Sequence, residues 1–224
     1  MIVSMGYKIA IDGPAGAGKS TIAKNISKQL GFIYVDTGAM YRAMALFLLS
    51  EGIDLKDEQA VSIKCADAYI TIKYENNEQV VYLNGENVNG MIRTEQVSKA
   101  ASLTSANPDV RKKLVELQQK LAQDTDVVMD GRDIGTCVLP DADVKVFLTA
   151  DSRVRAERRC KELEQKGEKC DIDVIEKDIK ERDYKDMTRD ISPLVAAEDA
   201  VLIDSSYMTI DEVAETIIKM AIKY

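Results

Sequence analysis

A glycine-rich segment near the start of the chain has the residue types that bind phosphate groups. Residues 13–21 read GPAGAGKST, which matches the pattern GxxxxGK[ST] between an apolar run and a helical pattern. The glycines let successive backbone N–H groups point into one concavity, a lysine reaches the β- and γ-phosphates, and a serine hydroxyl ligates Mg²⁺. The pattern predicts nucleoside triphosphate binding, and a glycine-rich turn without a ligand is the alternative. The predicted binding residues are Gly13, Pro14, Ala15, Gly16, Ala17, Gly18, Lys19, Ser20 and Thr21.

Arginines and carboxylates gather in two later loops. TGAMYR follows the apolar run FIYVD, and GRDIGT follows VVMD. Because ligands of open α/β sheets bind beyond the carboxyl ends of the strands, both loops are expected to point toward the phosphate-binding segment. Arg42, Arg132 and Asp133 therefore suggest a second polar pocket. Asp130 could hold the water shell of Mg²⁺, or it could be a turn aspartate before glycine.

Two charged helical stretches are weaker candidates. RVRAERR places Arg155, Arg158 and Arg159 on one helix face, which could close over a triphosphate or could be a solvated surface. The stretch KERDYKDMTRD places Arg182, Asp186 and Arg189 at i, i+4 and i+7, again as one stripe. Alternating charge along a helix is usually a surface with weak ion pairs, so this second stretch alone gives little support for a function.

Composition excludes several classes of function. The chain has no histidine, which removes the commonest general base and the Ser-His mechanisms. A net charge of −8 argues against a general nucleic-acid or membrane surface, so a polyanionic ligand needs a local cluster of cations. The longest apolar stretch is too short to span a bilayer, no signal peptide is found, and a cytoplasmic location is expected. The four cysteines form no CxxC pair and are expected to be free thiols rather than a zinc site or disulfides.

The pattern of the whole chain predicts the elements that must position these side chains. Five short apolar runs read as buried parallel strands: KIAID, FIYVD, VVMD, VKVFLTA and AVLID. Helical patterns separate most of them, with starts near Gly18, Gly38, Asp57, Thr94, Pro108, Ser152, Asp173 and Thr209. In the first helix, Ile22, Ile26 and Leu30 are expected to face the sheet. Residues 69–88 alternate polar and apolar around ENNE and predict a small antiparallel β insertion.

The motifs together resemble the bacterial-type cytidylate kinases over nearly the whole chain. The resemblance is carried by DGPAGAGKST, DTGAMYRA, RTEQVSKAAS, DGRDIGT, RAERR and IKERDYKDMTRDISPL. It implies a three-layer α/β fold of the P-loop NTPase type, with a five-stranded parallel sheet, the antiparallel insertion and a short lid. It also implies a single kinase domain over residues 1–224: a core of about 1–38, 94–152 and 190–224, a CMP-binding region of about 39–93, and a lid of about 153–170.

The resemblance further implies an activity and its residues. The family transfers the γ-phosphoryl group of ATP to CMP or dCMP with Mg²⁺, which Ser20 would ligate directly and Asp130 through water. Lys19, Arg132, Arg158 and Arg189 would be catalytic, and Arg158 and Arg159 correspond to the lid over ATP. The implied CMP site has three parts. Its phosphate would be held by Arg42, Arg132 and Arg189, its cytosine by Thr37, Ser102, Arg111 and Asp133, and its sugar by Arg182 and Asp186.

Elementary chemistry agrees with this assignment. A carboxylate such as Asp133 accepts from the exocyclic amino group of cytosine, whereas uracil would leave a buried polar group unpaired. The attacking phosphate oxygen is already ionised, so no histidine is needed. The expected partners are ATP and CMP or dCMP, without nucleic acid or membrane, and the chain is expected to be a monomer. The alternatives are a kinase of UMP, AMP or shikimate, or a nucleotide-operated regulatory switch.

Overall fold

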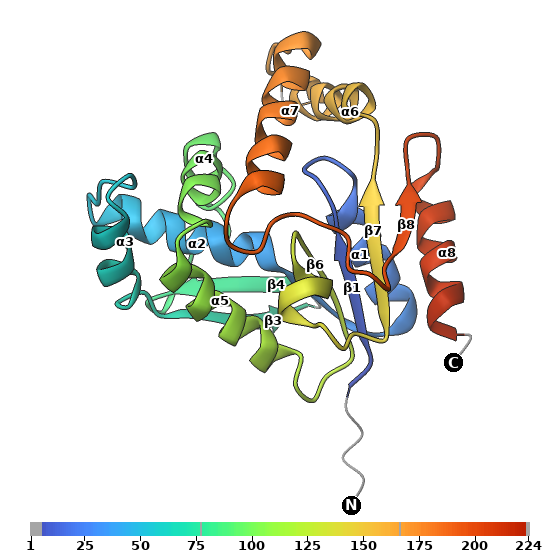
Figure 1. Ribbon diagram of the computed structural model, residues 1–224, viewed down its shortest axis with the longest axis horizontal. Coiled ribbons are helices and arrows are strands. Elements are labelled where there is room, and N and C mark those ends of the chain that lie inside the picture. The colour runs from blue at the N-terminus through green and yellow to red at the C-terminus, as the bar shows by residue number, and fades with distance from the viewer. Residues whose placement is uncertain (1–5, 77, 166, 223–224) are drawn as a thin grey trace, which may run out of the picture. The chain divides into compact units, whose positions relative to one another are not determined.

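The computed structural model describes residues 6–76, 78–165 and 167–222 and has an α/β architecture with two sheets (Figure 1). The larger sheet has five parallel strands in the order β2-β6-β1-β7-β8. The smaller sheet is antiparallel, in the order β3-β4-β5. The five predicted strands and the predicted β insertion are therefore confirmed.

The contacts between residues divide the chain into two compact units. The insert unit is Ile33–Thr125, and the core unit is Gly6–Phe32 together with the chain from Asp126 onward. The core unit contains β1 (Lys8–Asp12), α1 (Lys19–Leu30), β6 (Val127–Gly131), the π-helix η1 (Ile134–Val138), β7 (Val144–Thr149), α6 (Ser152–Gln165), α7 (Ile172–Thr188), β8 (Val201–Asp204) and α8 (Ile210–Ile222). The insert unit contains β2 (Ile33–Asp36), α2 (Thr37–Ser50), α3 (Glu58–Cys65), β3 (Ile70–Glu75), β4 (Glu78–Leu83), β5 (Glu86–Asn87), α4 (Glu95–Thr104) and α5 (Pro108–Leu121).

In the core unit, β1 is the central strand. It pairs in parallel with β6 on one side and β7 on the other, and its four residues from Ile9 to Asp12 are buried. Helices α1 and α8 pack on each other and on β6 and β7 (Figure 1). Ile22 and Ile26 of α1 are fully buried as predicted, whereas Leu30 at the end of the helix is only half-buried. The parallel strands thus end together beside the start of α1.

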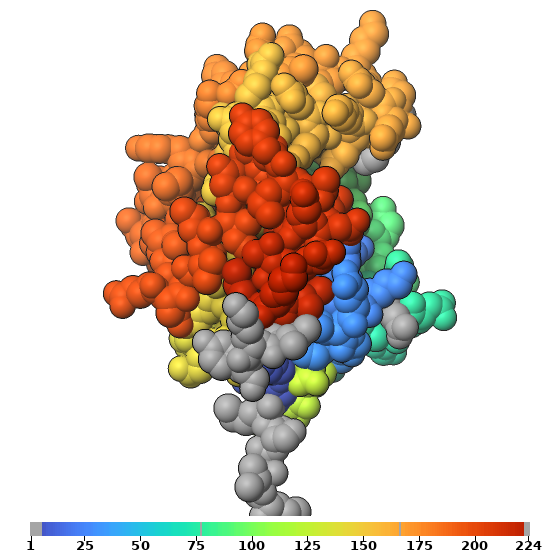
Figure 2. Space-filling view, turned by 90° about the vertical axis from the view of Figure 1, so that its right-hand side faces the viewer, coloured from blue at the N-terminus to red at the C-terminus, as the bar shows by residue number. Residues whose placement is uncertain are grey.

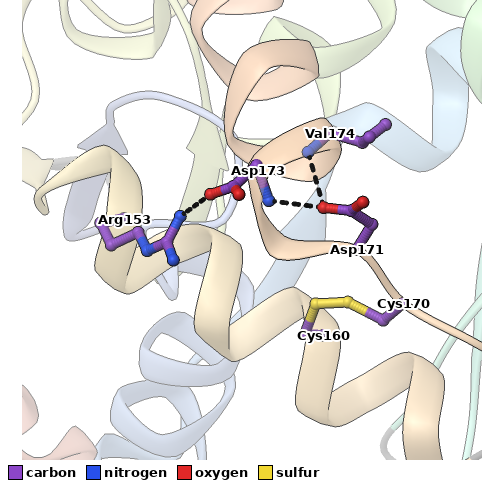
Figure 3. The surroundings of a disulfide bond; sticks show 6 residues. All are labelled: Arg153, Cys160, Cys170, Asp171, Asp173 and Val174. Atoms are coloured by element: carbon purple, nitrogen blue, oxygen red, sulfur yellow. Dashed lines mark hydrogen bonds and ion pairs between the residues drawn. A yellow bond between two sulfur atoms is a disulfide. The ribbon is translucent and has the colours of Figure 1, made fainter.

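Helices α6 and α7 follow the carboxyl end of β7 and pack against each other (Figure 1). Figure 2 shows them above the face formed by β8 and α8. Both helices begin within one residue of the predicted positions, and the Asp171 side chain caps α7 by accepting hydrogen bonds from the backbone N–H groups of Asp173 and Val174 (Figure 3).

The prediction of four free thiols is wrong for two of them. Cys160 of α6 and Cys170, just before α7, form a disulfide, with Cα atoms 5.5 Å apart (Figure 3). The two cysteines are ten residues apart in the chain, and the turn between α6 and α7 brings them together. Cys65 and Cys137 are free.

In the insert unit, α2 packs on α4, on α5 and on the β3–β4 hairpin. Ala45 of α2 lies in one apolar cluster with Val97, Ala100 and Ala101 of α4. The hairpin pairs Glu75 with Glu78 around the predicted turn, of which residue 77 lies outside the described residues. The short strand β5 was not predicted. None of the described helices is long and apolar enough to cross a bilayer.

Candidate active site at the phosphate loop

The glycine-rich segment forms the loop between β1 and α1 in the core unit. Gly13, Gly16 and Gly18 have φ values of +145°, +76° and +91°, which side-chain-bearing residues rarely adopt. A Cβ atom at Gly13 would also overlap the backbone carbonyl of Leu148 in β7. Gly18 is the N-cap residue of α1, so the loop leads directly into the positive end of the helix dipole. The backbone geometry that the motif predicts is therefore present.

Lys19 is the cation at the centre of this loop. It is 6% exposed, and its Nζ donates a hydrogen bond of 2.7 Å to the Pro14 carbonyl within the loop. Burial, and next the nearby guanidinium of Arg132, lower the pKa of Lys19 to about 7, although Asp130 and Asp12 favour its charged form. Arg182 also lowers this pKa, so two arginines of the predicted acceptor site act electrostatically on the phosphate-loop lysine.

Asp12, at the end of β1, holds the loop that follows β6. Its two carboxylate oxygens accept hydrogen bonds of 2.8 and 2.7 Å from the backbone N–H groups of Ile134 and Gly135. Burial raises the pKa of Asp12 to about 6 in spite of these bonds. Sequence reasoning missed Asp12, although its place between a buried strand and the first loop glycine is a detectable signal.

The predicted metal-binding residues meet in the core unit. The Ser20 hydroxyl donates a hydrogen bond of 2.9 Å to Asp130 Oδ2, and the Asp130 side chain is buried at the end of β6. Oxygen atoms are the ligands that Mg²⁺ prefers, and this cation is usually held by one or two protein groups together with phosphates and water. The hydroxyl and carboxylate therefore fit a magnesium ion by their chemistry and proximity.

Two ion pairs join the loop after β6 to the end of α7. Arg132 Nε donates to Asp186 Oδ2 at 2.8 Å, and Arg189 Nη2 lies 3.9 Å from Asp133 Oδ1. The Asp133 and Arg189 side chains are less than a tenth exposed. Arg189 is not on the same helical stripe as Arg182 and Asp186, because α7 ends at Thr188 and Arg189 has extended backbone. These pairs bring four of the predicted acceptor-site residues together.

The three arginines of α6 have different partners. Arg155 is buried and donates to the Ala15 carbonyl of the phosphate loop at 3.0 Å. Arg158 donates to the Ser205 carbonyl at 2.6 Å, and Arg159 forms an exposed ion pair with Glu162. Only Arg155 is hydrogen-bonded to the loop among the described contacts of the three, and it was not among the predicted ATP-binding residues.

In the insert unit, Asp36 organises the start of α2. It caps the helix by accepting from the Ala39 N–H at 2.9 Å and pairs with Arg42 at 3.1 Å. A Cβ atom at Gly38 would lie 3.0 Å from the Arg42 guanidinium, so a larger residue there would displace it. Arg42 Nε is buried and has no hydrogen-bond partner among the described residues. Arg93, which sequence reasoning missed, also approaches Asp36, at 3.4 Å.

The other predicted base-binding residues lie on three helices of the insert unit that pack together. Thr37 is buried at the start of α2, and Ser102 is half-buried on α4. Arg111 of α5 is 4% exposed, donates to the Ser105 carbonyl at 3.1 Å, and places its guanidinium 5.6 Å from the ring centre of Tyr41. The insert unit thus holds Thr37, Arg42, Ser102 and Arg111, whereas the core unit holds Arg132, Asp133, Arg182, Asp186 and Arg189.

Comparison with known proteins assigns a family. The family model described as cytidylate kinase matches residues 9–223. A cytidylate kinase of Lactobacillus johnsonii is 50% identical over 94% of this chain and 91% of its own length. One of Oceanobacillus iheyensis is 49% identical over 96% of this chain and 94% of its own length, and one of Caldicellulosiruptor saccharolyticus is 49% identical over 96% and 95%.

The likeness to solved structures concerns the fold alone. The crystal structure of an uncharacterized protein from Eubacterium ventriosum superposes with a TM-score of 0.53 at 14% identity, and the match covers 97% of this chain and 99% of that one.

Proposed function

We infer that this chain, which belongs to the cytidylate kinase family, is an enzyme that transfers a phosphoryl group to CMP. The single structural observation that supports this most is the arginine cluster beside the phosphate loop: Arg132 donates to Asp186 at 2.8 Å, and Arg189 lies 3.9 Å from Asp133. A triphosphate-binding loop alone needs no such neighbours, whereas a phosphoryl acceptor that is itself an anion does. The switch and the other acceptors are not favoured by these relatives.

We propose ATP as the donor and Mg²⁺ as its companion ion. The loop from Gly13 to Thr21 would cradle the phosphates with its backbone N–H groups, and Lys19 would contact the β- and γ-phosphates. Bound phosphate favours the charged form of Lys19 and so opposes the effect of burial. Ser20 would ligate Mg²⁺ and Asp130 would hold its water, and the ion would supply neutralisation of phosphate charge.

The proposed acceptor is CMP or dCMP. Its phosphate would be bound by Arg42, Arg132 and Arg189, and its sugar by Arg182 and Asp186. For the base, Asp133 would accept from the amino group while Arg111 donates to the ring nitrogen and carbonyl, with Thr37 and Ser102 as further contacts. Arg42 Nε is buried without a hydrogen-bond partner among the described residues, which supports the phosphate role of Arg42, because a phosphate oxygen would satisfy it.

Catalysis then consists of alignment and charge neutralisation. The acceptor phosphate is ionised near neutral pH, so Lys19, Arg132, Arg158 and Arg189 need only hold the two anions and stabilise the charge of the transferred group. Arg158 donates to Ser205 in this structure. Its proposed contact with ATP would use the remaining N–H groups of the guanidinium. We further propose that the chain works as a cytoplasmic monomer with a lid at about residues 153–170.

A panel of acceptors tests this function. Purified protein with ATP and Mg²⁺ is assayed for ADP formation with CMP, dCMP, UMP, AMP and shikimate in turn. We expect CMP and dCMP to be phosphorylated at least about tenfold more efficiently than UMP, since a mispaired buried polar group costs about 1–3 kcal/mol. If the highest efficiency belongs to AMP or shikimate, or if no cytidine diphosphate forms, the proposed function is wrong.

A further inference from the structure

The buried guanidinium of Arg155 contacts three parts of the core unit. Its Nε donates to the Ala150 carbonyl at the end of β7 at 2.9 Å, and one Nη donates to the Ala15 carbonyl of the phosphate loop at 3.0 Å. The same nitrogen lies 2.7 Å from Asp183 Oδ2 on α7. The aliphatic stem of Arg155 also covers Gly16, where an added Cβ would lie 3.4 Å from Arg155 Cβ.

Asp183 lies on α7 among predicted substrate-binding residues. It follows Arg182 directly and precedes Asp186, which is paired with Arg132 of the loop after β6. Its side chain is 14% exposed, and its Oδ1 is buried without a hydrogen-bond partner among the described residues. Helix α7 is thus connected to the phosphate loop through the Asp183–Arg155 pair and to the loop after β6 by Asp186.

We propose that Arg155 and Asp183 are positioning residues for phosphoryl transfer. The pair fixes the distance between the phosphate loop, which it contacts at the Ala15 carbonyl, and helix α7, which carries Arg182 and Asp186. Neither residue needs to touch a substrate in this role. The proposal rests on the proposed function, because it assigns the donor to the phosphate loop and the acceptor sugar to α7.

The physical reason is that transfer depends steeply on alignment. A displacement of about 1 Å between reacting groups can reduce turnover about a hundredfold, even when each substrate still binds. A buried ion pair with hydrogen bonds to two backbone carbonyls has a defined geometry, whereas exposed pairs between long side chains are mobile and weak. Loss of the pair should therefore reduce kcat more than it reduces the affinity for either nucleotide.

The first test is Asp183→Asn, which keeps the shape of the side chain and removes its charge. We expect kcat with CMP to fall at least about tenfold, while the Kd values of CMP and ATP, each measured alone by calorimetry, change less than about threefold. Asp173→Asn is the matched control, since Asp173 also joins α7 to α6, through an exposed pair with Arg153, and forms no described contact with the phosphate loop (Figure 3). Its kcat should stay within about twofold of wild type.

A double variant covers the case in which a lone buried charge prevents folding. Arg155→Met with Asp183→Leu removes both charges, and such replacements often leave stability unchanged. We expect the double variant to be folded by circular dichroism and to show the same loss of kcat as Asp183→Asn, because the two residues act as one unit.

Each outcome decides the proposal. It is overturned if folded Asp183→Asn or the double variant keeps kcat within about twofold of wild type, or if Kd rises as much as kcat falls. A double variant that does not fold assigns the pair a purely structural role and overturns it as well. Wild-type protein that fails to phosphorylate CMP refutes the proposed function itself, which separates that failure from a failure seen only in the variants.

Discussion

The carboxylates of this site differ in what surrounds them, and that difference separates their roles. Asp133 lies opposite a cation, with Arg189 Nη2 3.9 Å away, whereas Asp12 accepts from two backbone N–H groups and is desolvated. A carboxylate beside an arginine is suited to accept a hydrogen bond from a ligand. A group held by backbone bonds is suited to fix a loop.

Asp133→Asn tests base recognition. An amide can donate as well as accept a hydrogen bond. In the variant, the carbonyl of uracil would therefore face a group that can donate to it instead of a carboxylate. We expect the preference for CMP over UMP, about ten- to a hundredfold in wild type, to become smaller. The ratio of kcat/KM for the two acceptors measures this, with the exposed Asp141→Asn as control. A ratio that stays at the wild-type value shows that Asp133 does not read the base.

Asp12 should titrate far above an ordinary aspartate. Burial raises its pKa from 3.8 to about 6, against hydrogen bonds from Gly135 and Ile134, and Asp133 and Lys19 are the charged groups that act on it. Between these values the native state binds more protons than the unfolded chain, so the contribution of Asp12 to the free energy of unfolding decreases as the pH rises from about 4 to about 6.

Carbon-13 NMR of the side-chain carboxyls measures this titration directly. We expect a midpoint of about 6 for Asp12. Asp204, whose pKa is lowered from 3.8 by hydrogen bonds with Ser206, is an internal control in the same spectra. A midpoint for Asp12 at or below 4 would show that the backbone bonds outweigh desolvation.

At the scale of elements, the α6–α7 pair has covalent and ionic connections of different strength. The disulfide between Cys160 and Cys170 lies at the turn (Figure 3). The Arg153 pairs are exposed, whereas the Arg155–Asp183 pair is buried beside the phosphate loop. The end near the turn is thus stabilised by the covalent bond. The end near the site depends on buried charges.

Cys170→Ser should destabilise the α6–α7 pair. Removing a disulfide that closes a short loop costs about 2–3 kcal/mol in the chain-entropy model, so the melting temperature should fall without reductant. Dithiothreitol should lower the melting temperature of wild type but not of Cys170→Ser. The melting temperature of Cys137→Ser should still fall with dithiothreitol, because Cys137 is a free thiol. Mass spectrometry after alkylation gives the thiol count. Equal melting curves of wild type with and without dithiothreitol would contradict the expected contribution.

At the scale of the whole molecule, an acidic chain must bind two polyanions. With a net charge of −8, attraction comes from local cations rather than from the overall field. The residues proposed to bind the donor lie in the core unit.

Hydrogen exchange tests whether binding closes the site. We expect added protection of residues 153–170 and of the segment after Gly38 when CMP and a non-hydrolysable ATP analogue are both present, and less with either alone. Strand β1 is the control, since its buried amides should be protected in every state. Unchanged exchange of both segments in the ternary mixture would contradict a closing lid.

The sequence by itself determined the phosphate loop, the five strands and the start of α5 at Pro108. These features depend on neighbours in the chain: glycines for positive φ at residues 13, 16 and 18, β-branched runs for buried strands, and a proline in the first turn of the helix. The resemblance of its motifs to one kinase family also came from the sequence alone, and the family comparison confirmed it.

Tertiary structure alone decided which groups face each other. Asp12 lies 122 residues from Ile134, and Arg155 lies 140 residues from Ala15, so neither contact leaves a local pattern. Arginines of α6 that lie close together in the sequence have different partners. Arg155 contacts residues of α7 and of the chain just after β7, whereas Arg158 contacts Ser205, which follows β8. The Cys160–Cys170 disulfide likewise depends on the turn geometry. Partners and burial, which set charge and pKa, are properties of the packed chain.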